Sequence, residues 1–212
     1  MNDGKTIRKS KNYDNPLYLR HLRSMNQKWR RFLFLTTGFE EIEALVTMDI
    51  LRRGGVDIRS VSLIGNKMVA DGHQITVIAN YLFEEVDFAD AQMLILPGGP
   101  GTGEMNEHEE LKHEILSFFR QGKLLAAICA APMVFGGLGL LKGKRATCYP
   151  GYAKYLIGAH ITDMPVAVDG NITTGRAAGY TFEFALELLK QLKGKEIADE
   201  VAGEILPVVH RD

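Results

Sequence analysis

The sequence contains few cysteines and no pattern typical of a metal site. Only Cys129 and Cys148 are present among 212 residues, and no secretory signal precedes them. These features argue against a disulfide-stabilised extracellular scaffold and favour the reducing cytoplasm. The six histidines are scattered, and no pair with cysteine or glutamate has the spacing of metal ligands. We therefore predict no metal site.

The sequence also lacks an uninterrupted hydrophobic run long enough to cross a membrane. Residues 124–141, LLAAICAAPMVFGGLGLL, form an uncharged stretch of 18 residues. Pro132 and several glycines interrupt this stretch, so a buried strand followed by a buried helix fits better than a membrane span. We predict the strand at 124–128 and no association with membranes.

Acidic residues are scarce only at the start of the chain. Residues 1–31 contain nine Lys or Arg and two Asp, which leaves 16 basic and 24 acidic residues in the remainder. This basic segment has no apolar face and no repeated aromatics, so we favour a solvated extension over nucleic-acid binding. We predict a flexible extension at residues 1–30 and one domain at 31–212.

Strand and helix patterns alternate along this domain. A doubly wound α/β fold with a mostly parallel sheet is the expected result of such alternation. We expect the strands at 31–37, 57–64, 93–96, 124–128 and 145–147, two more within 161–174, a hairpin at 68–79, and helices at 40–53, 106–121, 180–192 and 196–202.

Cys129 is placed where the strand at 124–128 turns into the next helix. The small residues Ala130 and Ala131 follow it, and Pro132 suits the first turn of a helix. The positive end of a helix dipole would favour the thiolate over the thiol and make Cys129 reactive. The alternative is an inert core cysteine, because a cysteine in an apolar run often serves only as a small hydrophobic residue.

A reactive thiolate needs a partner group that takes or returns its proton. Ala130 follows Cys129, and no histidine is close in sequence. Carboxylates are available instead, because Glu40, Glu41 and Glu43 follow the first strand and should lie at the same sheet edge. We expect Glu40 and Glu41 to be solvated. Glu43 lies in an apolar stripe position beside Ile42, so it should be partly desolvated, with a raised pKa that lets it exchange a proton with Cys129.

The glycine-rich sequence PGGPGTG at 97–103 follows the strand at 93–96. It lacks a Walker lysine and the GxGxxG spacing of dinucleotide-binding loops. We interpret it as a loop whose backbone N–H groups face an oxyanion, with ordinary tight-turn chemistry as the alternative.

Several of these segments together resemble the ThiJ/PfpI superfamily, in the branch of the Parkinson-disease protein deglycase and similar bacterial proteins. The resemblance is carried by GFEEIEALVTMDILRRGG, LILPGGPGTG, LLAAICAAP, ATCYPG and TTGRAAGYTFEFALELL. It implies a flavodoxin-like fold, a homodimer and no cofactor. It also implies that Cys129 is the nucleophile, that Glu43 is the acid–base group, and that Gly99 and the N–H of Ala130 are oxyanion donors. Asp49 and Arg53 match positions near the dimer interface.

Three departures from the superfamily patterns narrow the predicted activity and the predicted set of site residues. Protease-like members carry histidine directly after the cysteine, so Ala130 argues against peptidase activity. Tyr149 replaces a histidine near the site of the disease-linked protein. In that branch an arginine reaches the site. Its position in the sequence corresponds loosely to His73 and better to Arg176. These three residues and Gly98 are our substrate-site candidates. Amidotransferase relatives need a late His-x-Glu pair, and the sequence has none after Ile161.

The resemblance implies a cofactor-independent cysteine enzyme that acts on reactive carbonyls or glycated substrates, as a glyoxalase or a deglycase. The alternative is a redox sensor or chaperone in an oxidative stress response, in which oxidation of Cys129 is the signal. The sequence leaves both open, because both need an exposed thiol with a low pKa.

Overall fold

The computed structural model describes residues 30–205. The predicted basic extension therefore lies outside the described residues, except for Arg30. The described chain is built around a seven-stranded sheet in the order β10-β11-β7-β6-β1-β2-β5. These strands are β1 (Arg30–Leu35), β2 (Ile58–Ser62), β5 (Tyr81–Leu82), β6 (Ala91–Leu96), β7 (Leu124–Ile128), β10 (Val166–Asp169) and β11 (Ile172–Gly175).

Every neighbouring pair in this sheet is parallel except the β10–β11 hairpin. The chain passes from β1 to β2 on one side and later returns to β6 on the other side of β1. Strand order therefore reverses between β1 and β6, which is where open α/β sheets form a crevice at the carboxyl ends of their strands. This topology confirms the predicted doubly wound α/β fold.

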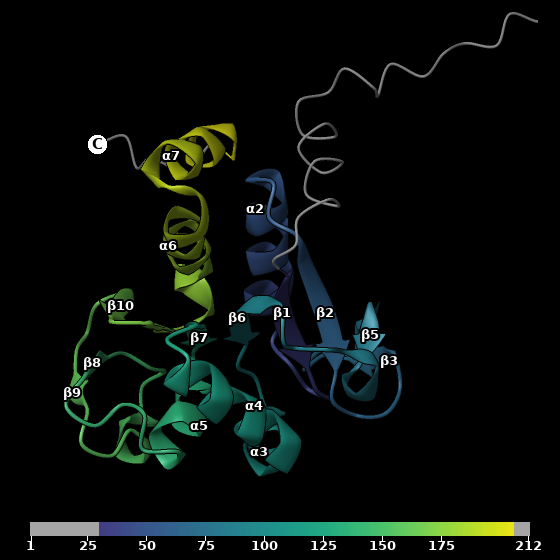
Figure 1. The fold of residues 1–212 in the computed structure, drawn as a ribbon, viewed down its shortest axis with the longest axis horizontal. Coiled ribbons are helices and arrows are strands. Elements are labelled where there is room, and N and C mark those ends of the chain that lie inside the picture. The colour runs from purple at the N-terminus through teal and green to yellow at the C-terminus, as the bar shows by residue number, and fades with distance from the viewer. Residues whose placement is uncertain (1–29, 206–212) are drawn as a thin grey trace, which may run out of the picture.

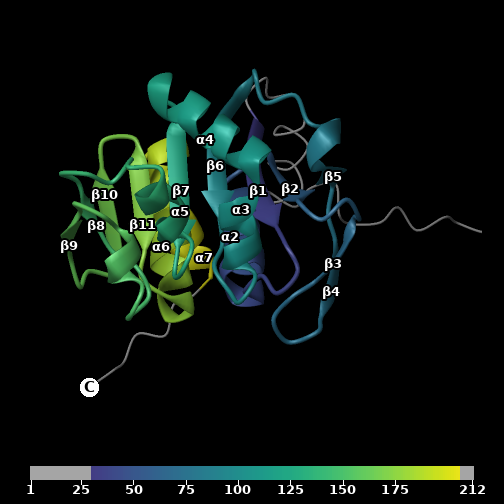
Figure 2. The same ribbon diagram turned by 90° about the horizontal axis from the view of Figure 1, so that it is seen from below.

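Helices cover both faces of the sheet (Figures 1 and 2). On one face pack α3 (Thr102–Glu107), α4 (Glu109–Arg120) and α5 (Pro132–Gly137). On the other pack α2 (Thr47–Arg53), α6 (Thr181–Lys193) and α7 (Lys195–Glu204). Alternation along β1 sends Phe32 and Phe34 into the first core and Leu33 and Leu35 into the second. The sequence of a strand that is buried on both faces is a continuous apolar run, as FLFL at residues 32–35 is.

Several shorter elements lie outside the seven-stranded sheet. The predicted hairpin at 68–79 is present as β3 (Met68–Ala70) and β4 (Thr76–Ile78), but it forms a separate two-stranded sheet. A second small sheet pairs β8 (Arg145–Ala146) with β9 (His160–Ile161). Single turns of 3₁₀-helix are η3 (Phe83–Glu85), η4 (Ala153–Tyr155) and η5 (Ala178–Tyr180).

Two predicted helices differ from the observed ones. The helix expected at 40–53 begins as a π-helix, η2 (Ile42–Val46), before it continues as α2. The helix expected at 106–121 is two helices that meet at His108, whose extended backbone ends α3 and whose ring accepts a hydrogen bond from the Leu111 N–H. A histidine N-cap is not among the usual capping residues, so this break carried no clear sequence signal.

No helix within residues 30–205 has the length and apolar character needed to cross a lipid bilayer.

Candidate active site

Four neighbouring strands end at the same edge of the sheet, and each delivers one part of the candidate site. β1 leads into the turn before η2, β6 leads into the glycine loop, β7 leads into Cys129, and β11 ends at Gly175. The parallel arrangement brings these segments together although they are far apart in sequence.

Cys129 occupies a strained backbone conformation at the end of β7. Its φ is +64°, in the left-handed region that residues other than glycine rarely adopt. The surrounding backbone holds it there, because the Cys129 N–H donates to the Gly175 carbonyl at 2.9 Å and the Cys129 carbonyl accepts from the Tyr149 N–H at 2.7 Å. The side chain is partly exposed. This is the sharp strand-to-helix turn of a nucleophile elbow.

Glu43 lies beside Cys129, on the π-helical turn. Its side chain is completely buried, and Oε2 accepts a hydrogen bond of 2.7 Å from the Gly98 N–H. Oε1 is also buried and has no hydrogen-bond partner among residues 30–205. An ionisable group with an unsatisfied oxygen is costly to bury, so its place beside a thiol points to a chemical role.

The glycine loop approaches both groups closely. A side chain at Gly98 would place its Cβ 2.8 Å from the Cys129 Cβ and 2.9 Å from Glu43 Oε2. Gly99 has a φ of +103°, and a Cβ there would lie 2.5 Å from the Gly38 carbonyl oxygen. Only glycine fits at these two positions, so the loop is more than an ordinary tight turn.

The thiol and the carboxyl group strongly affect each other's protonation. Burial raises the pKa of Glu43 to about 7, although hydrogen bonds from the Gly98 backbone and the Cys129 side chain lower it. Burial also raises the pKa of Cys129, and the charge of Glu43 and its hydrogen bond raise it further. Backbone hydrogen bonds from Ala130 and Gly99 act in the opposite direction. The two groups therefore titrate as a pair.

This result corrects the expectation that the helix N-terminus would make Cys129 a thiolate. Burial and the neighbouring carboxylate raise the pKa of Cys129, and α5, the helix that follows it, has only six residues. While Glu43 is ionised, the thiol retains its proton. The thiolate forms readily only when that proton lies on Glu43, which the raised pKa of Glu43 permits near neutral pH.

Glu40 and Glu41 are not the freely solvated acids that the sequence predicted. Glu40 Oε2 accepts a hydrogen bond of 2.6 Å from the Glu43 N–H, and burial raises its pKa. Glu41 Oε1 lies 2.6 Å from His73 Nδ1, and its Oε2 is buried. The structure thus places His73 at the edge of this acidic turn, next to Glu41 rather than next to Cys129.

The other substrate-site candidates lie in different surroundings. Tyr149 adjoins the site through its backbone, and its side chain is about half exposed. Arg176 binds the carbonyl oxygen and the carboxylate of Asp163. Its charge lowers the pKa of Cys148, although burial, the larger effect, raises that pKa. Cys148 packs in the core on the α3–α5 face, whereas Cys129 contacts the opposite core.

Asp49 and Arg53 form an ion pair within α2. Arg53 Nε lies 2.6 Å from Asp49 Oδ2, and both side chains are substantially exposed. This is the ordinary i,i+4 arrangement on a helix surface. Their expected place near a dimer interface therefore stays a prediction.

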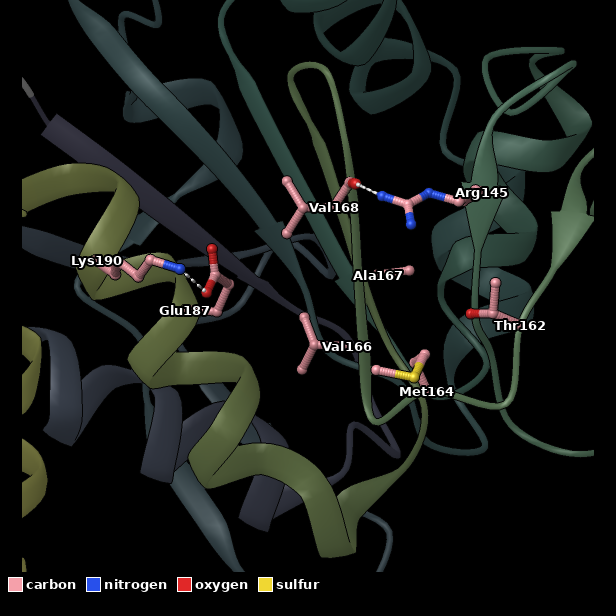
Figure 3. Close-up of a pocket in the computed structure, with 8 residues that line it drawn as sticks. All are labelled: Arg145, Thr162, Met164, Val166, Ala167, Val168, Glu187 and Lys190. Carbon is pink, nitrogen blue, oxygen red and sulfur yellow. Dashed lines mark hydrogen bonds and ion pairs between the residues drawn. The ribbon is translucent and has the colours of Figure 1, made fainter. Parts of the chain in front are cut away.

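Three cavities on the described surface are lined by neither Cys129 nor Glu43. The cavity shown in Figure 3 has a volume of about 360 Å³ and lies between β10 and α6. Its cations already have partners, because Lys190 pairs with Glu187 and Arg145 donates to the Val168 carbonyl oxygen. Its lining residues are Arg145, Thr162, Met164, Val166, Ala167, Val168, Glu187 and Lys190. Residues 30–205 also contain no cluster of three or more potential metal ligands.

Three parts of the site were missed by the sequence analysis. One is the π-helical turn, which directs Glu43 inward while Ile42 and Leu45 remain 46% and 41% exposed. The apolar spacing suggested instead that Glu43 shares a buried face with Ile42. The second is Gly175, whose carbonyl holds the elbow, and the third is the cap that Glu40 provides. A π-turn often marks a functional site, but spacing alone does not reveal it.

Comparison with known proteins identifies relatives of this arrangement. The chain is 39% identical over 173 residues to "Protein DJ-1 homolog B" of Arabidopsis thaliana, covering 80% of this chain and 39% of that protein. It therefore spans less than half of the length of the two Arabidopsis relatives. It is also 31% identical to a deglycase of Pyrococcus abyssi over 77% of this chain and 99% of that protein.

A solved structure shares the same fold. The crystal structure of Drosophila melanogaster DJ-1beta superposes with a TM-score of 0.81 at 32% identity, covering 86% of this chain and 100% of that chain. The family model described as "DJ-1/PfpI family" matches residues 30–191, which include the elbow, the glycine loop and the acidic turn. The chain belongs to the DJ-1/PfpI family.

Proposed function

We propose that this protein is a cofactor-independent cysteine enzyme that acts on reactive carbonyl compounds, of glyoxalase or deglycase type. The observation that carries the proposal is the buried Glu43 carboxyl group beside Cys129, with one oxygen lacking a partner and a pKa of about 7. A group with this pKa can both accept and return a proton at neutral pH. Relatives named deglycases support the same class of reaction.

The first step is addition of Cys129 to an aldehyde carbon. Glu43 takes the thiol proton, and the sulfur forms a bond to the carbon while the carbonyl electron pair moves to oxygen. The N–H groups of Gly99 and Ala130 already approach the sulfur, so the new oxyanion beside it can accept their hydrogen bonds. Protonation of that oxygen gives a hemithioacetal.

The remaining steps use the same carboxyl group. For methylglyoxal, Glu43 moves a proton from the former aldehyde carbon, through an enediol, to the adjacent carbon. The product is a thioester of lactate and Cys129. Water cleaves the thioester, which releases lactate and restores the thiol. The net reaction adds one water molecule to methylglyoxal and needs no external oxidant, reductant or cofactor.

The test is turnover of methylglyoxal to lactate by the full chain without added metal or glutathione. Glu43→Gln keeps the shape but cannot carry the proton, so kcat/KM should fall about 10²–10⁴-fold. Cys129→Ser should abolish turnover, because no strong base is present to activate a serine. Cys148→Ala is the control and should retain turnover, because Cys148 packs in the opposite core.

One outcome would favour a redox sensor instead. The wild type would then turn over neither methylglyoxal nor glycated amino acids, while peroxide would convert Cys129 cleanly to a sulfinate. Rapid turnover that depends on Glu43 would exclude sensing as the sole role of this cysteine.

A further inference from the structure

The acidic turn before α2 gathers more negative charge than the proposed reaction needs. Glu40, Glu41 and Glu43 fall within four residues, and the charges of Glu40 and Glu41 both raise the pKa of Glu43. Glu41 Oε2 is buried without a hydrogen-bond partner among the described residues, so water screens its charge poorly. A change in the charge on Glu41 would therefore alter how readily Glu43 binds a proton.

His73 contacts this charge from a different element. Its Nδ1 lies 2.6 Å from Glu41 Oε1, and its side chain is 72% exposed whereas that of Glu41 is 17% exposed. In either protonation state, a ring that carries its proton on Nδ1 can donate to the carboxylate. The positively charged form would also offset the negative charge.

The loop between β3 and β4 holds His73 in this position. Asp71, which is buried, accepts hydrogen bonds of 2.8 Å from the N–H groups of His73 and Ile75. The next residue, Gly72, donates to the Phe39 carbonyl oxygen at 2.9 Å. The hairpin is thus attached to the turn that carries the three acids, and His73 does not depend on its own side chain for its placement.

We propose that His73 is a positioning residue that binds Glu41 and thereby controls how readily Glu43 takes the proton of Cys129. The catalytic meaning of this inference rests on the proposed function, but its effect on proton exchange can be measured without any substrate.

The charged groups around Glu43 predict opposite effects for two substitutions. The acidic turn contributes Glu40 and Glu41, the elbow contributes Cys129, and the glycine loop contributes backbone N–H groups. The hairpin brings His73 to Glu41, and Asp71 holds the His73 backbone there. Removing the charge of Glu41 lowers the affinity of Glu43 for a proton. Removing His73 raises it, because Glu41 then acts without its partner.

The test is the rate of Cys129 alkylation by iodoacetamide as a function of pH, followed by mass spectrometry of the full chain. The wild type should show its first inflection near pH 7, where the Glu43–Cys129 pair loses its first proton. Glu41→Gln should move that inflection down, and His73→Ala should move it up, each by about 0.3–0.7 pH unit given the exposure of the pair. His73→Lys should restore the wild-type value.

A double variant shows whether His73 acts through Glu41. Adding His73→Ala to Glu41→Gln should cause little further shift, because the charge that His73 binds is already absent and only its small effect on Glu40 remains. His113→Ala is the matched control, since His113 is 77% exposed beside Glu114 on α4 and should leave the profile unchanged.

The proposal is overturned if the two single variants shift the inflection in the same direction, if neither shifts it, or if the His73→Ala shift persists in the double variant. A lack of carbonyl turnover would refute the proposed function but would leave this result standing, because alkylation requires only the pair itself.

Discussion

The proposed reaction depends on one proton shared between Glu43 and Cys129. Both groups are buried enough to disfavour their charged forms, and each charge opposes the other. With one negative charge on the pair, the proton can lie on sulfur or on the carboxyl group. Only the second arrangement provides a nucleophilic thiolate together with an acid that can protonate an oxyanion. In this proposal the buried carboxylate makes the thiol reactive by accepting its proton, although its charge raises the pKa of Cys129.

At this scale we predict a change in alkylation when Glu43 loses its acidity. In Glu43→Gln, Cys129 should titrate alone, and the inflection near pH 7 should be replaced by a single one at or above about 8.5, because burial still raises the thiol pKa. Cys148, which is 7% exposed, should be labelled more slowly in both proteins. Superimposable profiles for Glu43→Gln and the wild type would show that the two groups do not share a proton.

The same carboxyl group should make folding stability depend on pH. Its pKa is about 7 when folded and about 4.5 when unfolded, so the folded state binds more protons between these values and the free energy of unfolding falls as pH rises. By pH 8 the loss should be on the order of 2–3 kcal/mol. Urea unfolding at pH 5 and pH 8 tests this.

The contribution of Glu43 is isolated by comparing two variants. Glu43→Gln should reduce the pH dependence of unfolding. Glu183→Gln should not reduce it, because Glu183 is exposed. If Glu43→Gln unfolds with the same pH dependence as the wild type, the carboxylate is not desolvated in the folded protein.

At the scale of elements, the site depends on close contact between three loops. The glycine loop lies against both the acidic turn and the elbow, and the contacts at Gly98 leave no room for a side chain. The π-helical turn supplies the matching feature on the other side by pointing Glu43 at this loop. The loop therefore sets the distance between acid and thiol.

We predict that Gly98→Ala disrupts this spacing. The new methyl group would meet the Cys129 Cβ, Glu43 Oε2 and the Ala130 nitrogen at 2.8, 2.9 and 3.0 Å, so the elbow or the acid must move. A displacement of this kind can reduce kcat/KM about 10²-fold. The control is Gly103→Ala, because a Cβ at Gly103 meets nothing within 4 Å. Equal activity of the two variants, with thermal melts confirming that both fold, would show that the loop tolerates the extra group.

At the scale of the whole molecule, exposed apolar side chains gather on η2 and the β3–β4 hairpin. Leu45 and Ile78 line a cavity of about 230 Å³ together with residues of α2, β2 and β4. Ile78 is 71% exposed, and Met68 on the facing strand is 59% exposed. Apolar residues clustered in this way typically mark an interaction surface, and a second copy of the chain is the partner that the family resemblance implies.

We predict a homodimer at micromolar concentration that uses this surface. Ile78→Asp should shift the protein to a monomer in light scattering, because it buries a charge in the interface. Ile157→Asp is the matched control, since Ile157 is also 71% exposed but lies between η4 and β9. A wild type that remains monomeric would contradict the prediction.

The fold class, the strand-to-helix turn at Cys129 and the candidate acid could be predicted from the sequence alone. Continuous apolar runs and alternating helical patterns follow from burial on both faces of the sheet, and the strand-to-helix turn at Cys129 follows from local signals. The sequence also predicted that Glu43 is the desolvated acid, although it did so through an apolar stripe with Ile42 that the structure does not contain. These features can be predicted because each depends on neighbours in the chain or on the common edge of a parallel sheet.

The environment of these groups could not be predicted from the sequence and became visible in the three-dimensional structure. The π-helical turn directs Glu43 inward and leaves Ile42 exposed. The spacing of a regular α-helix does not predict this arrangement. Burial and the nearby carboxylate raised the pKa of Cys129, although the local helix signal alone favoured the thiolate. His73 reached Glu41 from a separate hairpin. Desolvation and charge interactions depend on what surrounds a group in three dimensions, and residues distant in sequence supply most of that environment.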